Sequence, residues 1–191
     1  RRMTRAFSEQ PVDQSVISAL VDLASRAPSA GKTQGWHLVV LQGNDVAKFW
    51  DDTLPASRRE SFRFKKLLDA PIIALPFADP DAYVERYSLP DKEQTGLGSG
   101  VDAWPTPYWT IDTSFAVMTL LHAAHDVGLG ALFFAVFNGE NELRSRLEVP
   151  EHVQLLGAIA IGWPLAEESS AGASAQLPRK KPDEIIHHSK W

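Results

Sequence analysis

Basic residues gather at both ends of this sequence. Arg1, Arg2 and Arg5 fall within the first five positions, while Arg179 and Lys180, followed by a third basic residue, stand near the C-terminus. Each group by itself is typical of a solvated charge cluster. Brought together by the fold, the two groups would form a site for a phosphate dianion, because arginine binds such a group through paired, charge-assisted hydrogen bonds. The spacing alone does not show that they meet.

Other short motifs match known functional signatures only in part. The Gly31-Lys32-Thr33 run lacks the earlier glycine of a phosphate-binding loop, and the pattern before it is helical rather than extended. The run from Ser29 to Lys32 has the serine and lysine spacing of β-lactamases without either partner motif. The Gly128–Gly130 pair lacks the third glycine of a dinucleotide fingerprint, so it indicates a helix cap instead.

Composition narrows the classes of function. The 191 residues are 44% hydrophobic, which predicts one domain with a real core, residues 1–191. A net charge of −5 gives nucleic-acid binding no global electrostatic support. Cysteine is absent, which excludes disulfides and thiolate sites, and the His122 and His125 pair indicates packing or a subunit contact rather than a metal site.

Targeting signals are not visible in the printed sequence. No apolar run approaches the roughly 20 residues needed to cross a bilayer, and no signal peptide stands at the start. We therefore expect a cytoplasmic protein without a membrane partner. Because residue 1 is an arginine, the removal of an earlier leader stays an open question.

One long segment is expected to organise the fold. Residues 112–127 contain no Gly or Pro, Thr110 or Asp112 can cap their start, and Gly128 can end them in a left-handed turn. Apolar residues cover most of the circumference, which is typical of a helix buried in a large core or between two subunits. Residues 131–137 then form a short apolar run that predicts a buried strand. Together they suggest a central helix that leads into a central strand.

The other segments alternate between helical and extended patterns, which indicates an α+β or α/β fold. The patterns predict helices beginning at Asp13 and over 45–54, 58–68 and 140–147, and strands over 36–41, 72–75 and 153–162. Residues 78–110 are rich in Pro, Gly, Asp and aromatic side chains, and would suit an excursion or lid with a little helix near 81–87. Within it, Trp104, Tyr108 and Trp109 are candidates for a substrate lid or, equally, for a hydrophobic plug at a dimer interface.

With these segments placed, the chain resembles the FMN-dependent nitroreductase family over nearly its whole length. The resemblance rests on residues 1–7, on 27–36 with their Ala-Pro-Ser and Gln-Gly-Trp, on the helix ending at 128–130, and on 162–164 followed by 179–182. These segments fall in the family's order. The resemblance implies an α+β, three-layer fold with a central, mainly antiparallel sheet flanked by helices. It also implies an intertwined homodimer that binds two FMN molecules at its interface.

The same resemblance implies an activity and a set of site residues. NADH or NADPH would reduce FMN, and a small organic acceptor such as a nitroaromatic or a quinone would then take the electrons in a ping-pong reaction. The residues that would hold the FMN phosphate and ribityl chain are Arg1, Arg2, Met3, Arg5, Arg179 and Lys180.

The flavin ring would meet two other segments. Pro28, Ser29 and Lys32 would approach it from the partner subunit, as the resemblance implies. Phe134, Ala135 and Val136 would pass along the ring edge near N5. Because these side chains are apolar, we predict that the Val136 main-chain N–H, or that of an immediate neighbour, faces N5 and that the side chains only pack.

Several positions depart from the family's pattern and leave the substrate open. Met3 stands where serine is usual, Lys32 replaces asparagine, Gly35 replaces proline, and Ala135-Val136 replace a more polar pair. Two alternatives therefore accompany the oxidoreductase. One is an enzyme that processes a flavin or deazaflavin as its substrate, and the other is a flavin-binding protein without turnover.

Overall fold

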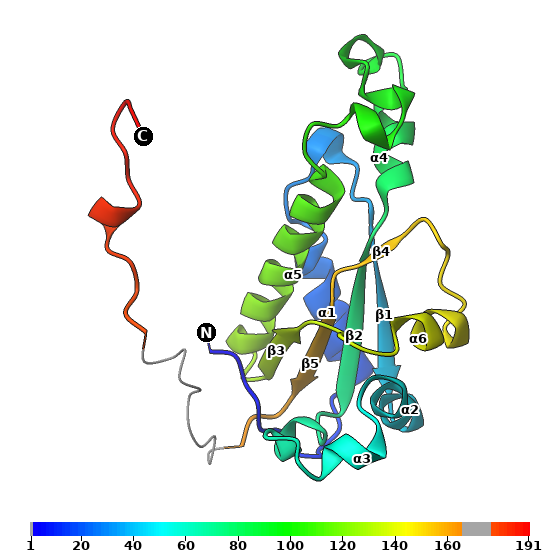
Figure 1. Ribbon diagram of the computed structural model, residues 1–191, viewed down its shortest axis with the longest axis vertical. Helices are drawn as coiled ribbons and strands as arrows, with labels where there is room; N and C mark the ends of the chain where they lie inside the picture. The colour runs from blue at the N-terminus through cyan, green and yellow to red at the C-terminus, as the bar shows by residue number, and fades with distance from the viewer. Residues whose placement is uncertain (1, 166–176) are drawn as a thin grey trace.

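The computed structural model describes residues 2–165 and 177–191 and shows a sheet between two layers of helices (Figure 1). The helices are α1 (Gln14–Ala24), α2 (Asn44–Thr53), α3 (Ala56–Arg59), α4 (Pro80–Tyr87), α5 (Tyr108–Asp126) and α6 (Glu140–Arg146). The strands are β1 (Trp36–Gln42), β2 (Ile72–Ala78), β3 (Gly130–Phe134), β4 (Gln154–Leu155) and β5 (Ala158–Gly162). The fold is α+β with a mainly antiparallel sheet, as the family resemblance implied.

The sheet is built around β2. Its strand order is β1-β2-β5-β3, β4 pairs with β2 outside this path, and every pairing between these strands is antiparallel. All seven residues of β2 are buried. Successive side chains on a strand point to opposite faces, so Ile73 and Leu75 enter one core while Ile72 and Ala74 enter the other.

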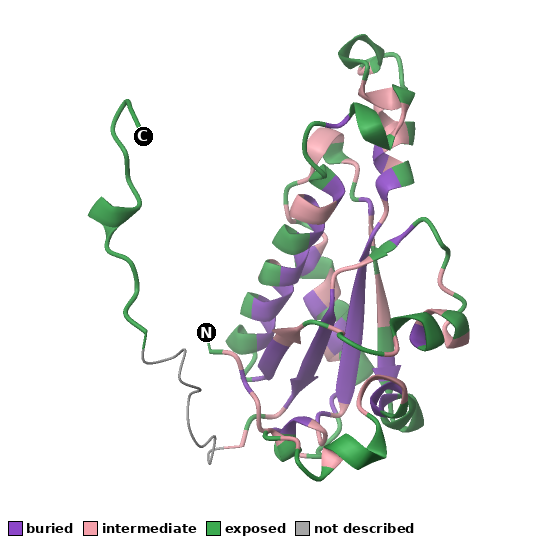
Figure 2. Ribbon diagram, in the orientation of Figure 1, coloured by how far each residue is buried: buried purple, intermediate pink, exposed green. Residues whose placement is uncertain are grey.

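Each face of the sheet carries its own apolar core. On one face α1 and α5 pack together through residues such as Leu20 and Leu120. On the other face α2 and α6 contribute Phe49, Trp50 and Leu143. Figure 2 shows the buried residues concentrated on the strands and on the inner sides of these helices.

The helix α1 starts where the sequence predicted, and Asp13 fixes its start by capping. Asp13 is the N-cap, and its Oδ1 accepts from the Ser15 amide at 2.8 Å. A side-chain oxygen at this position satisfies an amide that has no partner inside the helix. The buried residues Ile17, Leu20 and Ala24 recur at helical spacing and turn this face toward α5.

The long helix α5 begins earlier than predicted. Its first residue is Tyr108 and Pro107 occupies the N-cap position, so neither Thr110 nor Asp112 caps it. Gly128 follows its end with φ of 81°, the left-handed conformation that was expected there. One side of the helix is buried, while Phe115 is 47% exposed.

Three predicted elements differ from the structure. Residues 58–68 do not form a helix: α3 ends at Arg59, and a 3-10 turn covers Lys65–Leu67. The predicted strand over 153–162 is interrupted at Gly157, whose φ is 145°. The strand β3 ends at Phe134 and pairs only with β5 among the named strands, so it lies near the edge of the sheet and not at its centre.

The N-terminal segment covers the outer edge of β3. Met3 forms a parallel bridge with Ala131, and the Thr4 amide donates to the Ala131 carbonyl at 3.0 Å. Thr4 approaches so closely that a Cβ on Gly130 would lie 2.7 Å from its side chain. Glycine at position 130 therefore allows this segment to dock.

The excursion over 78–110 has a small core of its own. Tyr83 contacts Trp104 and Trp109 in edge-on geometry, with ring centroids 5.7 and 6.3 Å apart. The Trp104 indole donates to the Leu97 carbonyl at 3.0 Å. Figure 1 shows this region at one end of the molecule, beyond the sheet. Among the described residues no helix is both long and apolar enough for a bilayer crossing.

Candidate functional site

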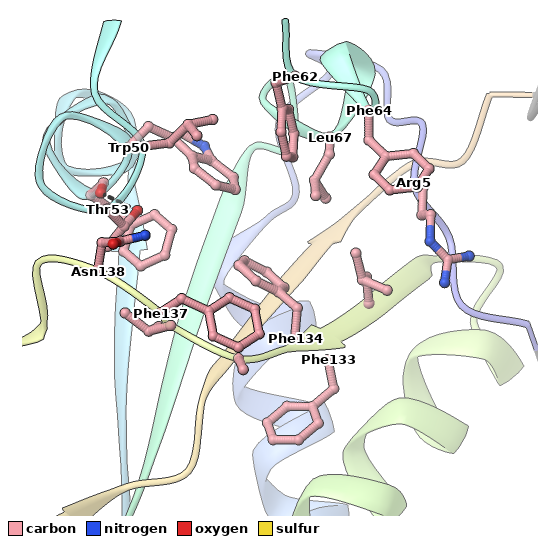
Figure 3. Close-up of a pocket in the computed structure, with 15 residues that line it drawn as sticks. Arg5, Trp50, Thr53, Phe62, Phe64, Leu67, Phe133, Phe134, Phe137 and Asn138 are labelled. Carbon is pink, nitrogen blue, oxygen red and sulfur yellow. Dashed lines mark hydrogen bonds between the residues drawn. The ribbon is translucent and has the colours of Figure 1, made fainter. Parts of the chain in front are cut away.

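A pocket of about 370 Å³ opens beside the C-terminal end of β3. Four segments line it: α2, the connection over 62–67, β3 with the following residues 135–138, and the N-terminal segment through Arg5. Figure 3 shows Phe62, Phe64 and Arg5 on one side of this pocket and Phe134 and Phe137 on the other. Arg5 is the only charged residue among the described residues that line it.

Aromatic side chains form the inner wall of the pocket. Trp50 stacks on Phe134 with centroids 5.8 Å apart and an angle of 6° between the rings. Phe49 meets Trp50 edge-on at 4.9 Å. These residues arrive here because α2 buries Val46, Phe49 and Trp50 on one side of the helix, at the i, i+3, i+4 spacing. Packed rings of this kind give the pocket a rigid, apolar wall.

The chain offers a main-chain donor where β3 ends. The ladder with β5 stops at the pair Phe134–Ala158, and the chain then continues along the pocket as Ala135 and Val136. Within the described ranges 2–165 and 177–191, the Val136 N–H donates to no backbone acceptor. A half-buried amide without a protein partner is a binding group for a ligand acceptor atom, because leaving it unpaired is unfavourable.

Arg5 supplies positive charge at the other side. Its Nη1 donates to the Met3 carbonyl at 3.2 Å, and its Cζ lies 5.4 Å from the centroid of the Phe64 ring. The side chain is half-buried. The pocket as a whole therefore suits a planar, apolar ring that has an acceptor on one edge and carries a negatively charged group.

The predicted N-terminal basic cluster is divided between two sides of its segment. Arg5 lines the pocket, whereas Arg2 lines a separate hollow with His125. Residues three apart on an extended chain point in opposite directions, which explains the separation. Met3 lies between them and packs against both cores. Arg1 falls outside the described residues.

Pro28, Ser29 and Lys32 do not line the pocket within their own chain. They belong to the loop between α1 and β1, which Figure 1 shows beside α4 and the start of α5. The Ser29 hydroxyl accepts from the Gln34 amide at 3.0 Å, and Lys32 is exposed. The structure of one chain therefore does not bring this loop to the pocket.

A buried carboxyl group holds the same loop in place. Oδ2 of Asp112, in the first turns of α5, accepts from the Ala30 amide at 2.7 Å and from the Tyr83 hydroxyl at 2.8 Å. Burial, together with this bond to Asp112, raises the pKa of Tyr83 above its ordinary value. Asp112 is thus an internal anchor of the loop and not the helix cap that the sequence suggested.

The loop also contains unusual backbone. Gly31, Lys32 and Gln34 have φ of 61°, 57° and 54°. The left-handed backbone conformation is unfavourable for Lys and Gln, and it persists only where the surrounding structure enforces it. The Arg86 guanidinium contributes by donating from Nε to the Gly31 carbonyl at 2.9 Å. The loop tip, with Lys32 on it, is therefore fixed in one shape at the surface.

The C-terminal tail stays apart from the pocket. Residues 177–191 are exposed throughout, including Arg179 and Lys180. Among the described residues the tail forms no hydrogen bond with residues 2–165, and Figure 1 shows it away from the sheet. Among the described residues, Arg2 and Arg5 therefore do not meet Arg179 and Lys180 within one chain.

The sequence reasoning missed most of the residues that line the pocket, among them Trp50, Phe62 and Phe64. Arg63 stands between the two phenylalanines, and its Cζ lies 5.3 Å from the Phe64 ring centroid. The Phe62-Arg63-Phe64 triplet alternates apolar and charged side chains, a period of two that favours extended chain over helix. This signal could have separated the connection from the predicted helix. The candidate lid residues Trp104 and Trp109 do not line the pocket.

Comparisons with known proteins agree with this architecture. A protein of Archaeoglobus fulgidus, provisionally named NADH dehydrogenase/NAD(P)H nitroreductase, is 27% identical over 195 residues, which cover 100% of this chain and 94% of the relative. The 5,6-dimethylbenzimidazole synthase of Rhodospirillum rubrum is 26% identical over 182 residues, with coverages of 87% and 80%. A solved structure of an FMN-dependent nitroreductase from Clostridium difficile R20291 has a TM-score of 0.66, at 20% identity, and covers 100% of this chain and 96% of that one.

The family comparison covers the whole folded body. The model described as the nitroreductase family matches residues 1–163, a span that includes every strand of the sheet. It also includes the N-terminal segment, the loop before β1 and the pocket beside β3. A match of this extent shows that the chain belongs to the nitroreductase family.

Proposed function

We propose that this protein is an FMN-dependent oxidoreductase in which NADH or NADPH reduces FMN and a small organic acceptor reoxidises it. The observation that carries the proposal is the pocket beside β3, which combines an apolar aromatic wall, the unpaired Val136 N–H and the Arg5 guanidinium. Membership of the nitroreductase family and the names of its relatives support the same reaction class.

The residues of the pocket fit this cofactor. An isoalloxazine ring is planar and largely apolar, as is the wall made by Trp50 and Phe134. N5 on its polar edge needs a hydrogen-bond partner, and the Val136 N–H would be available to serve as that donor. Its ribityl phosphate needs cations, and Arg5 stands at the opposite wall. When bound, FMN would supply hydride and electron transfer, and these residues would orient it and exclude water.

A homodimer would complete the site. The predicted residues Pro28, Ser29, Lys32, Arg179 and Lys180 lie away from the pocket of their own chain. A second copy could supply them, because the loop tip is rigid and exposed and the tail is not packed on its own chain. The exposed side of α5, with Phe115 and Met118 at 47% and 44% exposure, offers an apolar surface for that contact.

The visible spectrum of the purified full chain tests the proposal. We expect a yellow protein whose flavin bands disappear when NADPH or NADH is added without oxygen and return when a quinone or nitroarene is added. A colourless protein that takes up no FMN when the cofactor is supplied would refute FMN binding. Bound flavin that neither nucleotide reduces would instead favour a flavin-binding protein without turnover.

One observation favours a second candidate. The relative from Rhodospirillum rubrum is a 5,6-dimethylbenzimidazole synthase by name, so a scaffold of this family also supports production of a benzimidazole. The flavin or a deazaflavin would then be the substrate. Incubation of the reduced protein with excess FMN under oxygen separates the two: loss of total flavin supports the second candidate, and constant total flavin with continued NADPH oxidation supports the first.

A further inference from the structure

The side chain of Arg86 on α4 binds two other segments at once. Its Nε donates to the Gly31 carbonyl at 2.9 Å, at the tip of the loop before β1. Its Nη1 and Nη2 donate to the two carboxylate oxygens of Asp91 at 2.8 and 2.7 Å, in the part of the excursion that follows α4. The half-buried guanidinium therefore connects the loop tip, α4 and the rest of the excursion through three hydrogen bonds.

The bond to the Gly31 carbonyl acts on the strained backbone of the loop tip. This carbonyl belongs to the same planar peptide group as the Lys32 N–H, which donates to the Ser29 carbonyl at 2.9 Å. Rotation of that group would change ψ of Gly31 and φ of Lys32 together. Because Lys32 has a φ of 57°, which is unfavourable for a residue with a side chain, the peptide group needs partners that hold it in place. Arg86 holds one side of the group and Ser29 holds the other.

Aromatic packing joins the same regions. A Cβ on Gly31 would lie 2.9 Å from the Tyr87 ring, so glycine at this position lets the loop tip rest on that ring. Tyr87 also meets Trp104 edge-on, with ring centroids 4.7 Å apart. The Tyr87 ring therefore contacts both the loop tip and the small aromatic core of the excursion.

The fork between Arg86 and its partners depends on geometry as well as on charge. A planar guanidinium can bind both oxygens of a carboxylate and still direct Nε at a further acceptor, whereas a lysine ammonium is a point charge without this arrangement. The bonds from Arg86 hold the pKa of the Asp91 carboxyl below its ordinary value. Asp91 is therefore ionised at neutral pH, and the fork is intact there.

The loop tip and the excursion behave as one body in this arrangement. We propose that Arg86 is a positioning residue that joins them into one rigid unit, so that each copy of the chain presents both to the other copy in a preformed arrangement. The inference rests on the proposed function, which assigns Ser29 and Lys32 to the pocket of a second copy. The physical reason is that a surface ordered before binding loses less conformational freedom when it binds. Arg86 itself does not line the pocket and acts only through the loop.

The test compares four single variants of the full chain. Arg86→Gln removes the fork, Arg86→Lys keeps the charge without the planar geometry, and Asp91→Asn weakens the attachment to the excursion alone. Arg26→Gln is the matched control, because Arg26 precedes the same loop in the sequence but its guanidinium forms an exposed ion pair with Asp22 at 2.9 Å.

Amide hydrogen exchange, followed by mass spectrometry on each protein with and without FMN, measures how often the loop opens. We expect Arg86→Gln to speed exchange at residues 30–34 about tenfold, while exchange in the buried strand β2 stays unchanged. Arg86→Lys should resemble Arg86→Gln, and Arg26→Gln should resemble the parent. Asp91→Asn should speed exchange both in the excursion after α4 and at the loop tip.

Fluorescence titration measures the second consequence, which is the dissociation constant for FMN. We expect this constant to rise about tenfold in Arg86→Gln and in Arg86→Lys, the effect of losing one hydrogen bond to a charged group in the supporting structure. Arg26→Gln should keep the parent value.

Three results would overturn the inference. They are parent-like exchange at residues 30–34 in Arg86→Gln, a loop tip that is unaffected by Asp91→Asn, and faster loop exchange in Arg86→Gln with a parent-like dissociation constant for FMN. In each case the parent protein still binds FMN, so the proposed function survives. A parent protein that binds no FMN removes the proposed function, and with it the role of the unit in the pocket of a second copy.

Discussion

At the scale of single residues, Val136 gives the sharpest test of how the pocket handles N5. We expect Val136→Ala to keep FMN and most of the NADPH oxidation rate, because only the main-chain N–H is required. Val136→Pro removes that donor and fixes φ. It should slow flavin reduction by roughly 10- to 1,000-fold, the scale of losing one preorganised donor.

Stopped-flow reduction under anaerobic conditions measures this effect. FMN content and molecular mass must be normal in both variants, so that the rate reports the missing donor and not a disturbed fold. A correctly folded Val136→Pro protein whose flavin is reduced as fast as in the parent would contradict the assignment of the Val136 N–H as the donor to N5.

Arg5 should contribute to cofactor retention through charge. We expect Arg5→Ala to weaken FMN binding by about 1.5–3 kcal/mol, the range for a hydrogen bond to a charged group. Arg2→Ala is the matched control, because Arg2 lines a different hollow. Equilibrium dialysis with FMN and riboflavin measures the effect. Riboflavin binding as tight as FMN binding in the parent would show that no phosphate contact exists.

Tyr83 should make stability sensitive to high pH. Burial and the bond to Asp112 raise the pKa of Tyr83. The contribution of Tyr83 to the free energy of unfolding is therefore fully present below the ordinary tyrosine pKa of about 10 and declines as the pH rises above that value. Urea unfolding is measured between pH 8 and 11. Above pH 10 the free energy of unfolding of the parent should fall by up to about 1.4 kcal/mol per pH unit more than that of Tyr83→Phe. Equal slopes of unfolding free energy against pH in the parent and in Tyr83→Phe would show that the buried Tyr83 hydroxyl does not cause the pH dependence. Tyr108→Phe is the control, since Tyr108 is 41% exposed.

At the scale of elements, the break between β4 and β5 shapes the end of β3. Gly157 has φ of 145°, and a Cβ there would lie 2.6 Å from the Phe134 carbonyl oxygen. We expect Gly157→Ala to lower the free energy of unfolding by roughly 3 kcal/mol, from backbone strain and the clash together. It should also reduce FMN affinity, because Phe134 lines the pocket.

Chemical denaturation measures this change, and Gly96→Ala provides the comparison. Gly96 has φ of 72° but no atom within 4 Å of an added Cβ, so only the conformational cost of about 1–2 kcal/mol applies. Similar decreases in the free energy of unfolding in Gly157→Ala and Gly96→Ala would mean that the close approach of position 157 to the Phe134 carbonyl is unimportant.

Elements with a strong local signal could be predicted from the sequence, and the others depended on tertiary contacts. Asp13 marks the start of α1 and Gly128 follows the end of α5 by capping chemistry that is visible in the sequence. The connection after α3 was wrongly predicted as helix, although the alternation of apolar and charged side chains over 62–64 favours an extended chain that turns Phe62 and Phe64 toward the pocket. The sequence proposed the main chain after β3 as part of the site, and a pocket lies beside it, while the place of Trp50 in that pocket depends on its stacking with Phe134 from a distant segment.

At the scale of the whole molecule, the exposed side of α5 predicts an obligate homodimer. An intertwined interface should exceed roughly 2,000 Å². We expect Phe115→Glu to reduce the dimer fraction and the FMN content together, because charge in the contact is unfavourable and the partner would supply part of the site. Leu89→Glu is the control, since Leu89 is 46% exposed on the excursion. Light scattering that finds a folded, FMN-loaded monomer at micromolar concentration would contradict the prediction.

The docking of the N-terminal segment on β3 has a consequence for solubility. Met3 and Thr4 pair with Ala131 at an edge of the sheet that would otherwise present unpaired peptide groups. Such an edge is a template for strand addition by other chains. A proteolytic cut just after Arg5 would therefore remove a cation from the pocket and, in the same event, uncover an aggregation-prone edge. Damaged molecules would tend to leave solution as aggregates, so a soluble preparation would be enriched in molecules whose pocket is intact.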